Sequence, residues 1–128
     1  MIGPELQKLI IDELKVAPAI ANGRVYDRVP SSNPYPRVTV GDEQTVDNGN
    51  TCSDGWEIYA DVHVWSQYAG RVEAKQIMAS AVPRLLAISN LPGFKILAAE
   101  LDAHRIFTEP DGLTTHGVIT IRYVIDPA

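Results

Sequence analysis

Hydrophobic residues recur at helical spacing near the start of the chain. They lie three or four positions apart, with charged side chains mostly on the opposite side, and they are Leu6, Leu9, Ile10 and Leu14. This spacing predicts an amphipathic helix. Pro4 stands where proline favours a first helical turn, and Pro18 marks the far boundary of the helix.

A second helical pattern follows Ser66. Residues 67–88 carry one apolar stripe, formed by Ala74, Ile77, Met78, Ala81 and Leu85. Ser66 is the predicted cap of this helix, because a serine oxygen can accept a hydrogen bond from a free backbone N–H group of the first turn. Pro83 is predicted to kink or end the helix, since proline has no N–H group to donate.

Strict alternation between the helices predicts one long strand. Its apolar face carries Trp56, Ile58, Ala60, Val62 and Val64. Its mixed face carries Glu57, Tyr59, Asp61, His63 and Trp65. Successive side chains of a strand point to opposite faces, so the first set is the predicted core and the second the predicted accessible set.

Shorter patterns complete the predicted fold. A proline-rich connector over residues 28–37 leads into a short strand over 37–41, and an extended segment 94–109, a turn 110–117 and a strand 118–125 form a hairpin. The order helix, strand, strand, helix, strand, strand predicts an α+β fold. We expect an antiparallel or mixed sheet with two main helices packed on one side, in a single domain over residues 1–128.

Composition and charge narrow the class of protein. Apolar residues at 45% and charged residues at 21% are typical of a soluble globular domain. A net charge of −5 argues against a protein that coats nucleic acid, which needs clustered lysine and arginine. The single cysteine, Cys52, excludes an intrachain disulfide. The charged N-terminal segment resembles neither a signal peptide nor a membrane anchor, so we expect an intracellular protein without a membrane partner.

Two Asp-x-His pairs raise the question of a metal or acid–base site. Asp61 and His63 share one strand face, as Asp102 and His104 do, and carboxylate with imidazole can bind zinc or iron. The first pair, however, shares its face with glutamate, tyrosine and tryptophan, which is typical of a surface that meets solvent or a partner. We therefore predict exposed or interface residues and expect no metal or other cofactor.

Nucleophilic and phosphate-binding chemistry find no support in the sequence. Cys52 lies in a polar stretch without an adjacent cation to lower its pKa. The chain has no nucleophile-elbow, phosphate-loop or dinucleotide-binding motif. We expect no catalytic residue.

An acidic stretch over residues 41–55 is the remaining unusual feature. It contains no basic residue and four carboxylates, Asp42, Glu43, Asp47 and Asp54. We expect a long loop here. Two interpretations stay open: a solvated loop, or a segment with a task that becomes ordered on a partner.

From Tyr35 to Ile125 the chain resembles the tail completion proteins of long-tailed phages, which also occur in prophages and gene transfer agents. The order and spacing of the whole set carry the resemblance. The residues are Trp65, Ser66, Gly70, Glu73, Ala74 and Ile77, followed by Asp111-Gly112, His116-Gly117 and the terminal apolar strand.

The resemblance implies a structural virion protein, assembled in the host cytoplasm, that forms a ring, usually a hexamer, at the head-proximal end of the tail. Such a ring ends polymerisation of the tail tube protein and joins the tail to the head–tail connector protein, while DNA passes through without specific binding. A ring needs contacts between two different surfaces of neighbouring copies. We expect Glu57, Tyr59, Asp61, His63 and Trp65 to form such a subunit interface. We expect Asp42, Glu43, Asp47 and Asp54 to line the lumen or meet the tube.

Three alternatives stay open at this point. The first is a head-completion or connector ring on the portal side. The second is a metal-dependent enzyme built on the two Asp-x-His pairs, and the third is a small-molecule-binding α+β module that dimerises through its sheet.

Overall fold

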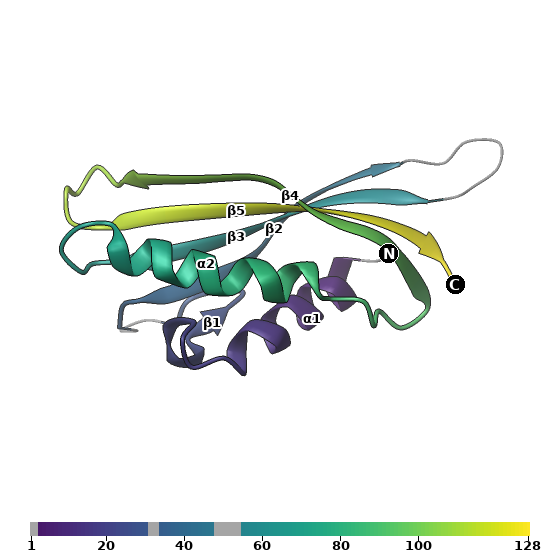
Figure 1. Cartoon of the computed structure of the whole chain (residues 1–128), viewed down its shortest axis with the longest axis horizontal. Coiled ribbons are helices and arrows are strands. Elements are labelled where there is room, and N and C mark those ends of the chain that lie inside the picture. The colour runs from purple at the N-terminus through teal and green to yellow at the C-terminus, as the bar shows by residue number, and fades with distance from the viewer. Residues whose placement is uncertain (1–2, 31–33, 48–54) are drawn as a thin grey trace.

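A computed structural model describes residues 3–30, 34–47 and 55–128 of the chain (Figure 1). Its elements, in chain order, are helix α1 (Gly3–Lys15), the 3-10 turn η1 (Ala21–Gly23), strands β1 (Val25–Tyr26), β2 (Arg37–Asp47) and β3 (Trp56–Ser66), helix α2 (Val72–Leu86), and strands β4 (Phe94–Thr108) and β5 (Thr115–Pro127). No helix within the described ranges has the length and apolar character needed to cross a membrane.

The strands form one five-stranded sheet in the order β1-β2-β3-β5-β4. The short β1 runs parallel to β2, and the other neighbouring strands are antiparallel. The sheet is therefore mixed, and with two helices the predicted α+β class is confirmed. Strand β3 pairs with β5 without interruption, whereas β2 has a bulge between Val40 and Glu43.

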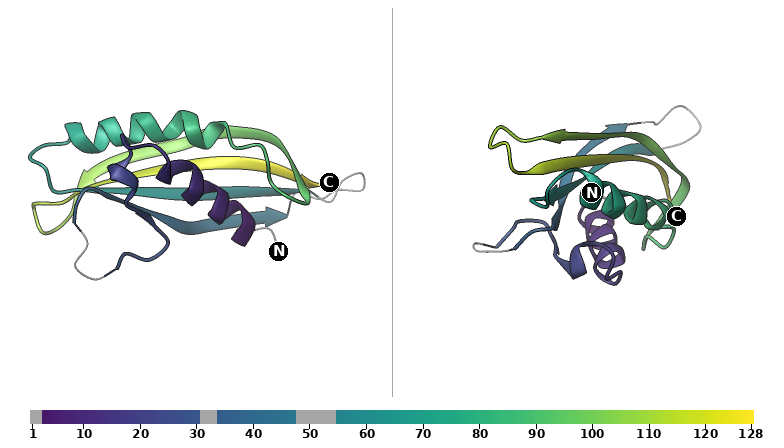
Figure 2. Two further views of the ribbon diagram at one scale, coloured as in Figure 1. Left: turned by 90° about the horizontal axis from the view of Figure 1, so that it is seen from below. Right: turned by 60° about the vertical axis from the view of Figure 1, so that its left-hand side comes forward.

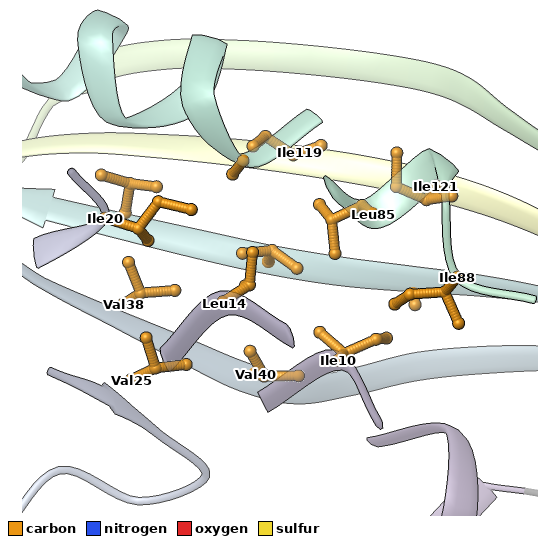
Figure 3. Close-up of a cluster of buried hydrophobic side chains, with 14 of the residues drawn as sticks. Ile10, Leu14, Ile20, Val25, Val38, Val40, Leu85, Ile88, Ile119 and Ile121 are labelled. Carbon is orange, nitrogen blue, oxygen red and sulfur yellow. The ribbon is translucent and has the colours of Figure 1, made fainter. Parts of the chain in front are cut away.

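Both helices pack against the same face of the sheet (Figure 2). The core lies between them and the sheet, and Figure 3 shows part of it. Leu6, Ile10 and Leu14 are the buried side chains of α1. On β3, Ile58, Ala60, Val62 and Val64 are buried and the residues between them are half-buried, which confirms the two predicted faces at these positions. Trp56, which was also predicted to be core, is only half-buried.

Tyr123 and Gly117 of β5 position helix α2 against the sheet. The buried Tyr123 hydroxyl donates a hydrogen bond of 2.7 Å to the Leu85 carbonyl, in the last turn of the helix where such carbonyls lack a helical partner. Burial raises the pKa of Tyr123, which keeps the hydroxyl protonated as the donor. Gly117 lets the helix approach closely, because a Cβ atom at this position would overlap the Met78 sulfur.

Several predicted boundaries were wrong. The predicted short strand 37–41 continues to Asp47, so residues 41–47 are strand and not loop. Pairing with β3 explains this, because each residue from Glu43 to Asp47 finds a partner there despite the polar sequence. The two-residue β1 and the turn η1 were not predicted, since neither has a periodic pattern.

The second helix also differs from its prediction. It begins at Val72, after Gly70 with a φ of +86°, and Ser66 does not cap it. The Ser66 hydroxyl instead accepts the Tyr68 N–H at 3.2 Å and donates to Glu73 at 2.7 Å. Pro83 lies within the last turn, and the helix runs three residues further, to Leu86.

The hairpin between β4 and β5 has a shorter turn than predicted. Strand β5 begins at Thr115, and the turn is organised by Asp111, whose carboxylate accepts the Leu113 and Thr114 N–H groups at 2.8 and 2.9 Å. Hydrogen bonds from the side chain and backbone of Thr114 lower the pKa of Asp111. Such a turn lets Asp-Gly connect two strands in few residues.

Candidate functional site

The face of the sheet opposite the helices is the candidate site, and we call it the open face. On β3 it consists of Glu57, Tyr59, Asp61, His63 and Trp65, all half-buried, and on β5 of His116, Thr120 and Arg122. The alternation that buries the apolar residues of β3 under the helices places its polar and aromatic residues here.

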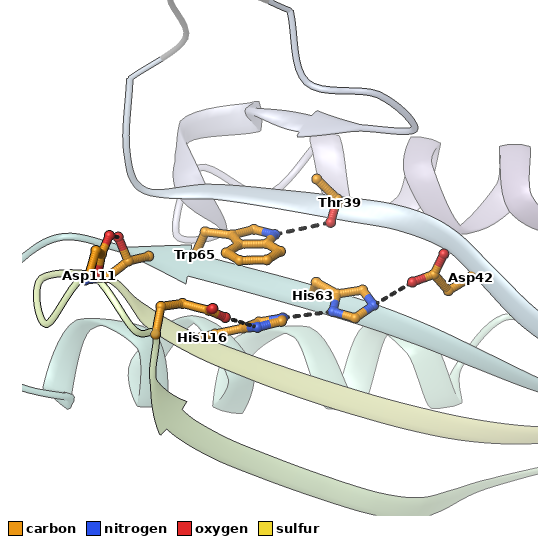
Figure 4. Close-up of polar contacts among 8 residues, drawn as sticks. Thr39, Asp42, His63, Trp65, Asp111 and His116 are labelled. Atoms are coloured by element: carbon orange, nitrogen blue, oxygen red, sulfur yellow. Dashed lines mark hydrogen bonds and ion pairs between the residues drawn. The ribbon is translucent and has the colours of Figure 1, made fainter.

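Two histidines form the centre of the open face (Figure 4). His63 Nδ1 lies 2.7 Å from His116 Nε2. The second nitrogen of His63 lies 2.9 Å from Asp42 Oδ2, and the second nitrogen of His116 lies 2.6 Å from Glu109 Oε1. A carboxylate therefore stands at each end of a row of four side chains drawn from β2, β3, β5 and the turn before β5.

Donor counting assigns the protons in this row. A carboxylate only accepts hydrogen bonds, so the nitrogen facing Asp42 and the nitrogen facing Glu109 must both carry a proton. One further proton lies between the rings. The row therefore has three positions at which a proton is shared. Desolvation by burial lowers the pKa of His116 and outweighs the opposing hydrogen bond from Glu109, which favours the neutral form of this ring.

An indole ring holds the histidines in place. Trp65 stacks on His116 with ring centres 3.8 Å apart and an angle of 17° between the ring planes. Its Nε1–H donates to Thr39 Oγ1 on β2 at 3.1 Å. Trp65 is thus tied to both neighbouring strands.

Further along β3 the open face is charged. Arg122 forms ion pairs with Glu57 and, at 3.4 Å, with Glu100 on β4. Thr120 donates to Asp61 Oδ1 at 2.6 Å. These cross-strand pairs connect β3, β5 and β4, so the face is a polar surface whose charges are mostly matched in pairs.

The two Asp-x-His pairs do not come together. His63 contacts His116, whereas Asp61 contacts Thr120, and His104 lies on the helix side of β4, lining a groove with α2. Across the described ranges, no group of three or more His, Cys, Asp or Glu side chains is placed to hold a metal ion.

Sequence reasoning missed His116 as the partner of His63 and Glu109 as the partner of His116. The sequence did indicate which side His116 faces, because His116, Thr120 and Arg122 all lie at even-numbered positions and therefore on one face of β5. Only the pairing of His116 with Trp65 across the strands, however, brings the two imidazoles together.

The predicted acidic loop is divided by the structure. Asp42 and Glu43 lie at the β2 bulge, where Asp42 contacts His63 on the open face and Glu43 lies beside Gly3 of α1. Asp47 is the last residue of β2. Asp54 and Cys52 lie outside the described residues, so their predicted roles stay predictions.

Fold and site together define a small α+β subunit with one face of its sheet covered by helices and the other polar, rich in aromatic residues and open. Residues 8–126 match the family described as tail completion protein gp17, and the chain belongs to that family. It is a structural protein of the phage virion, located in the tail.

Individual relatives agree with this assignment. The tail completion protein gp17 of Bacillus phage SPP1 is 31% identical over 125 residues, which cover 94% of this chain and 92% of the relative. The solved structure of bacteriophage SPP1 gp17 superposes with a TM-score of 0.64 at 28% identity, covering 94% of this chain and 88% of that one. A chain in the virion of a native gene transfer agent particle has the same fold, with a TM-score of 0.89 at 18% identity over 98% of this chain and 97% of its own length.

Proposed function

We propose that the protein forms a ring, with six copies as the expected number, at the head-proximal end of the tail tube. The ring ends polymerisation of the tube and joins the tail to the head–tail connector. Membership of the tail completion family, over nearly the whole chain, is the observation that carries this proposal. The protein acts by assembly and not by catalysis, and it needs no cofactor.

The shape of the subunit supports assembly into a ring. A closed ring joins each copy to the next through two different surfaces. The sheet has different edges on its two sides, a long β4 and a β2 that is only partly covered by β1, and it has an open face that no helix covers. One subunit therefore offers several distinct surfaces for contacts with neighbouring copies and with the tube or connector.

Inactivation of the gene in a phage or prophage that carries it tests the joining function. We expect filled heads and separate tails, with tubes of irregular length, visible by electron microscopy. Supplying the chain from a plasmid should restore joined particles. Normal tails joined to heads without this protein would overturn the proposal, and unstable filled heads with tubes of normal length would favour a head-completion ring instead.

The same complementation assay tests the predicted contact residues. Asp42, Glu43, Asp47 and Asp54 are proposed to line the lumen or meet the tube, so their replacement by Asn and Gln should reduce the yield of joined particles. Glu5→Gln with Asp12→Asn removes exposed charge from α1 and is the matched control. Tyr59→Ala and Trp65→Ala test the predicted subunit interface on the open face.

A further inference from the structure

An apolar groove runs between α2 and the edge strand β4. Its volume is about 310 Å³, and its walls are Met78 and Val82 on the helix side and Leu101 and Ile106 on the strand side. Leu101 is 40% exposed. The two polar side chains that line the groove are Lys75 and His104.

The groove lies beside a free sheet edge. Strand β4 pairs with β5 on one side only, and within the described ranges no strand lies on its other side. An edge strand of 15 residues leaves a row of backbone N–H and C=O groups for another strand to pair with. Together, the apolar groove and the free edge are typical of a surface that contacts another protein.

A second free edge lies at the opposite side of the sheet. Strand β1 pairs with Val38 and Thr39 of β2, so the β2 outer half, residues 41–46, has no partner on its outer side within the described ranges. All six of these residues are exposed. This segment is acidic, because it contains Asp42 and Glu43 and because the Asp27 carboxylate lies beside Gly41.

The charges of the two edges are complementary on each face of the sheet. On the helix side, Lys75 and His104 line the groove, and Glu43 belongs to the β2 outer half. Glu43 lies on the helix side because it pairs across the strands with the buried Ala60 and lies beside Gly3 of α1. On the open side, β4 has Arg105 and β2 has Asp42. Of the acids on β4, Glu100 is paired with Arg122, and Asp102 lies at a bulge.

Of these groups, Lys75 and Glu43 are also available for a partner. Within the described ranges neither Lys75 nor Glu43 makes an ion pair, in contrast to Glu57 with Arg122 and Glu13 with Arg84. Desolvation by burial raises the pKa of Glu43. A lysine from a second copy would supply an opposite charge to this carboxylate.

We propose that the groove between α2 and β4 of one copy receives the acidic β2 outer half of a second copy. The inference rests on the proposed ring and specifies its contact. The two surfaces lie on opposite sides of one sheet, so the contact repeats from copy to copy in one direction and can close into a ring. This proposal assigns the subunit contact to the two edges of the sheet in place of the open face, and it places Glu43 against a second copy in place of the lumen or tube.

Charge reversal tests the contact. Lys75→Glu and Glu43→Lys should each raise the concentration at which the protein self-associates by at least about tenfold, because each places like charges together at the contact. The double variant, with both changes in one chain, should return to within about threefold of the native value, since it restores an opposite pair. Lys15→Glu changes an exposed lysine of α1 and is the control. Sedimentation velocity gives the association, and circular dichroism verifies the fold of each variant.

Mixed disulfide formation gives an independent measurement. In chains with Cys52→Ser, His104→Cys and Glu43→Cys variants should form a covalent dimer under oxidation when mixed, whereas either variant alone should form little.

The outcomes distinguish a failure of the proposed contact from a failure of the proposed ring. If both single variants associate like the native chain and no mixed disulfide forms, the groove does not hold a second copy, although the ring stands. If the variants associate normally but no longer bind purified tail tubes, the occupant is the tube protein and the proposal is wrong. If the native chain stays monomeric at every concentration and no mixed disulfide forms, the self-assembled ring and its contact both fail.

Discussion

At the scale of single residues, the contact of 2.7 Å between His63 and His116 limits how many protons the open face can hold. Three protons supply one hydrogen bond to each of the three contacts in the row from Asp42 to Glu109. A fourth proton would place two imidazolium rings in contact, with the Arg105 guanidinium adding further repulsion at His116. The buried ring, His116, is therefore the group whose protonation opposes folding.

The stability of the protein should consequently fall as the pH falls below neutral. Desolvation lowers the pKa of folded His116, so the unfolded chain, with an ordinary histidine pKa of about 6.5, takes up the proton first. The free energy of unfolding should therefore decrease as the pH drops through about 6.5 and continue to decrease until the lower folded pKa is reached. The slope for this one proton is at most about 1.4 kcal/mol per pH unit.

Urea unfolding at a series of pH values between neutral and mildly acidic measures this slope. His116→Gln should flatten the curve in that range, whereas His104→Gln, at an exposed position on the other face, should leave it unchanged. A slope that survives in the His116 variant would assign the pH dependence to other groups.

At the scale of elements, β3 is the central strand, and its two faces have opposite tasks. Val62 is fully buried under the helices, whereas Tyr59 lies half-buried on the open face with one long hydrogen bond of 3.4 Å to Glu57. Since side chains alternate along a strand, the faces cannot be exchanged without moving every residue of β3.

The two faces should respond differently to the same substitution. Val62→Asp should prevent folding, because it buries an unpaired carboxylate at a cost of about 3 kcal/mol or more. Tyr59→Ala should cost about 1 kcal/mol or less, and Tyr59→Asp is the control that matches the new charge. Circular dichroism with thermal unfolding measures the loss of stability in each of the three variants. Equal loss of structure in Val62→Asp and Tyr59→Ala would contradict the assignment of faces.

At the scale of the whole molecule, the chain is acidic, with a net charge of −5. Lysine and arginine are distributed around the fold, and several are matched by carboxylates within the chain, as in the pairs of Arg84 with Glu13 and Arg122 with Glu57. In the proposed ring, such an acidic chain would repel phosphate groups, which is consistent with the proposed passage of DNA without specific binding.

The purified protein should therefore not retard duplex DNA in a gel, even at low ionic strength where phosphate contacts are strongest. A variant with Asp42→Lys and Glu43→Lys is the informative comparison, because it reverses charge at the edge of β2 without touching the core. Salt-sensitive retardation by the native chain would contradict passive passage of DNA.

Local patterns in the sequence were sufficient for the elements whose period is unbroken. The apolar spacing of α1 and the alternation of β3 predict which side chains are buried, because burial of one face follows from the helical or strand repeat alone. The α+β class follows from the order of those elements. The turn at Asp111-Gly112 was also recognisable, although its predicted ends were too wide.

Contacts between segments far apart in the chain were decided only by the tertiary structure. Residues 41–47 read as a polar loop, and pairing with β3 makes them a strand, since a strand needs a partner that lies elsewhere in the sequence. His63 and His116 are 53 positions apart and meet because β3 and β5 align in one register. The groove beside β4 likewise depends on where α2 lies over the sheet. Periodicity within a segment specifies its buried face, whereas the choice of neighbour depends on the packing of the whole chain.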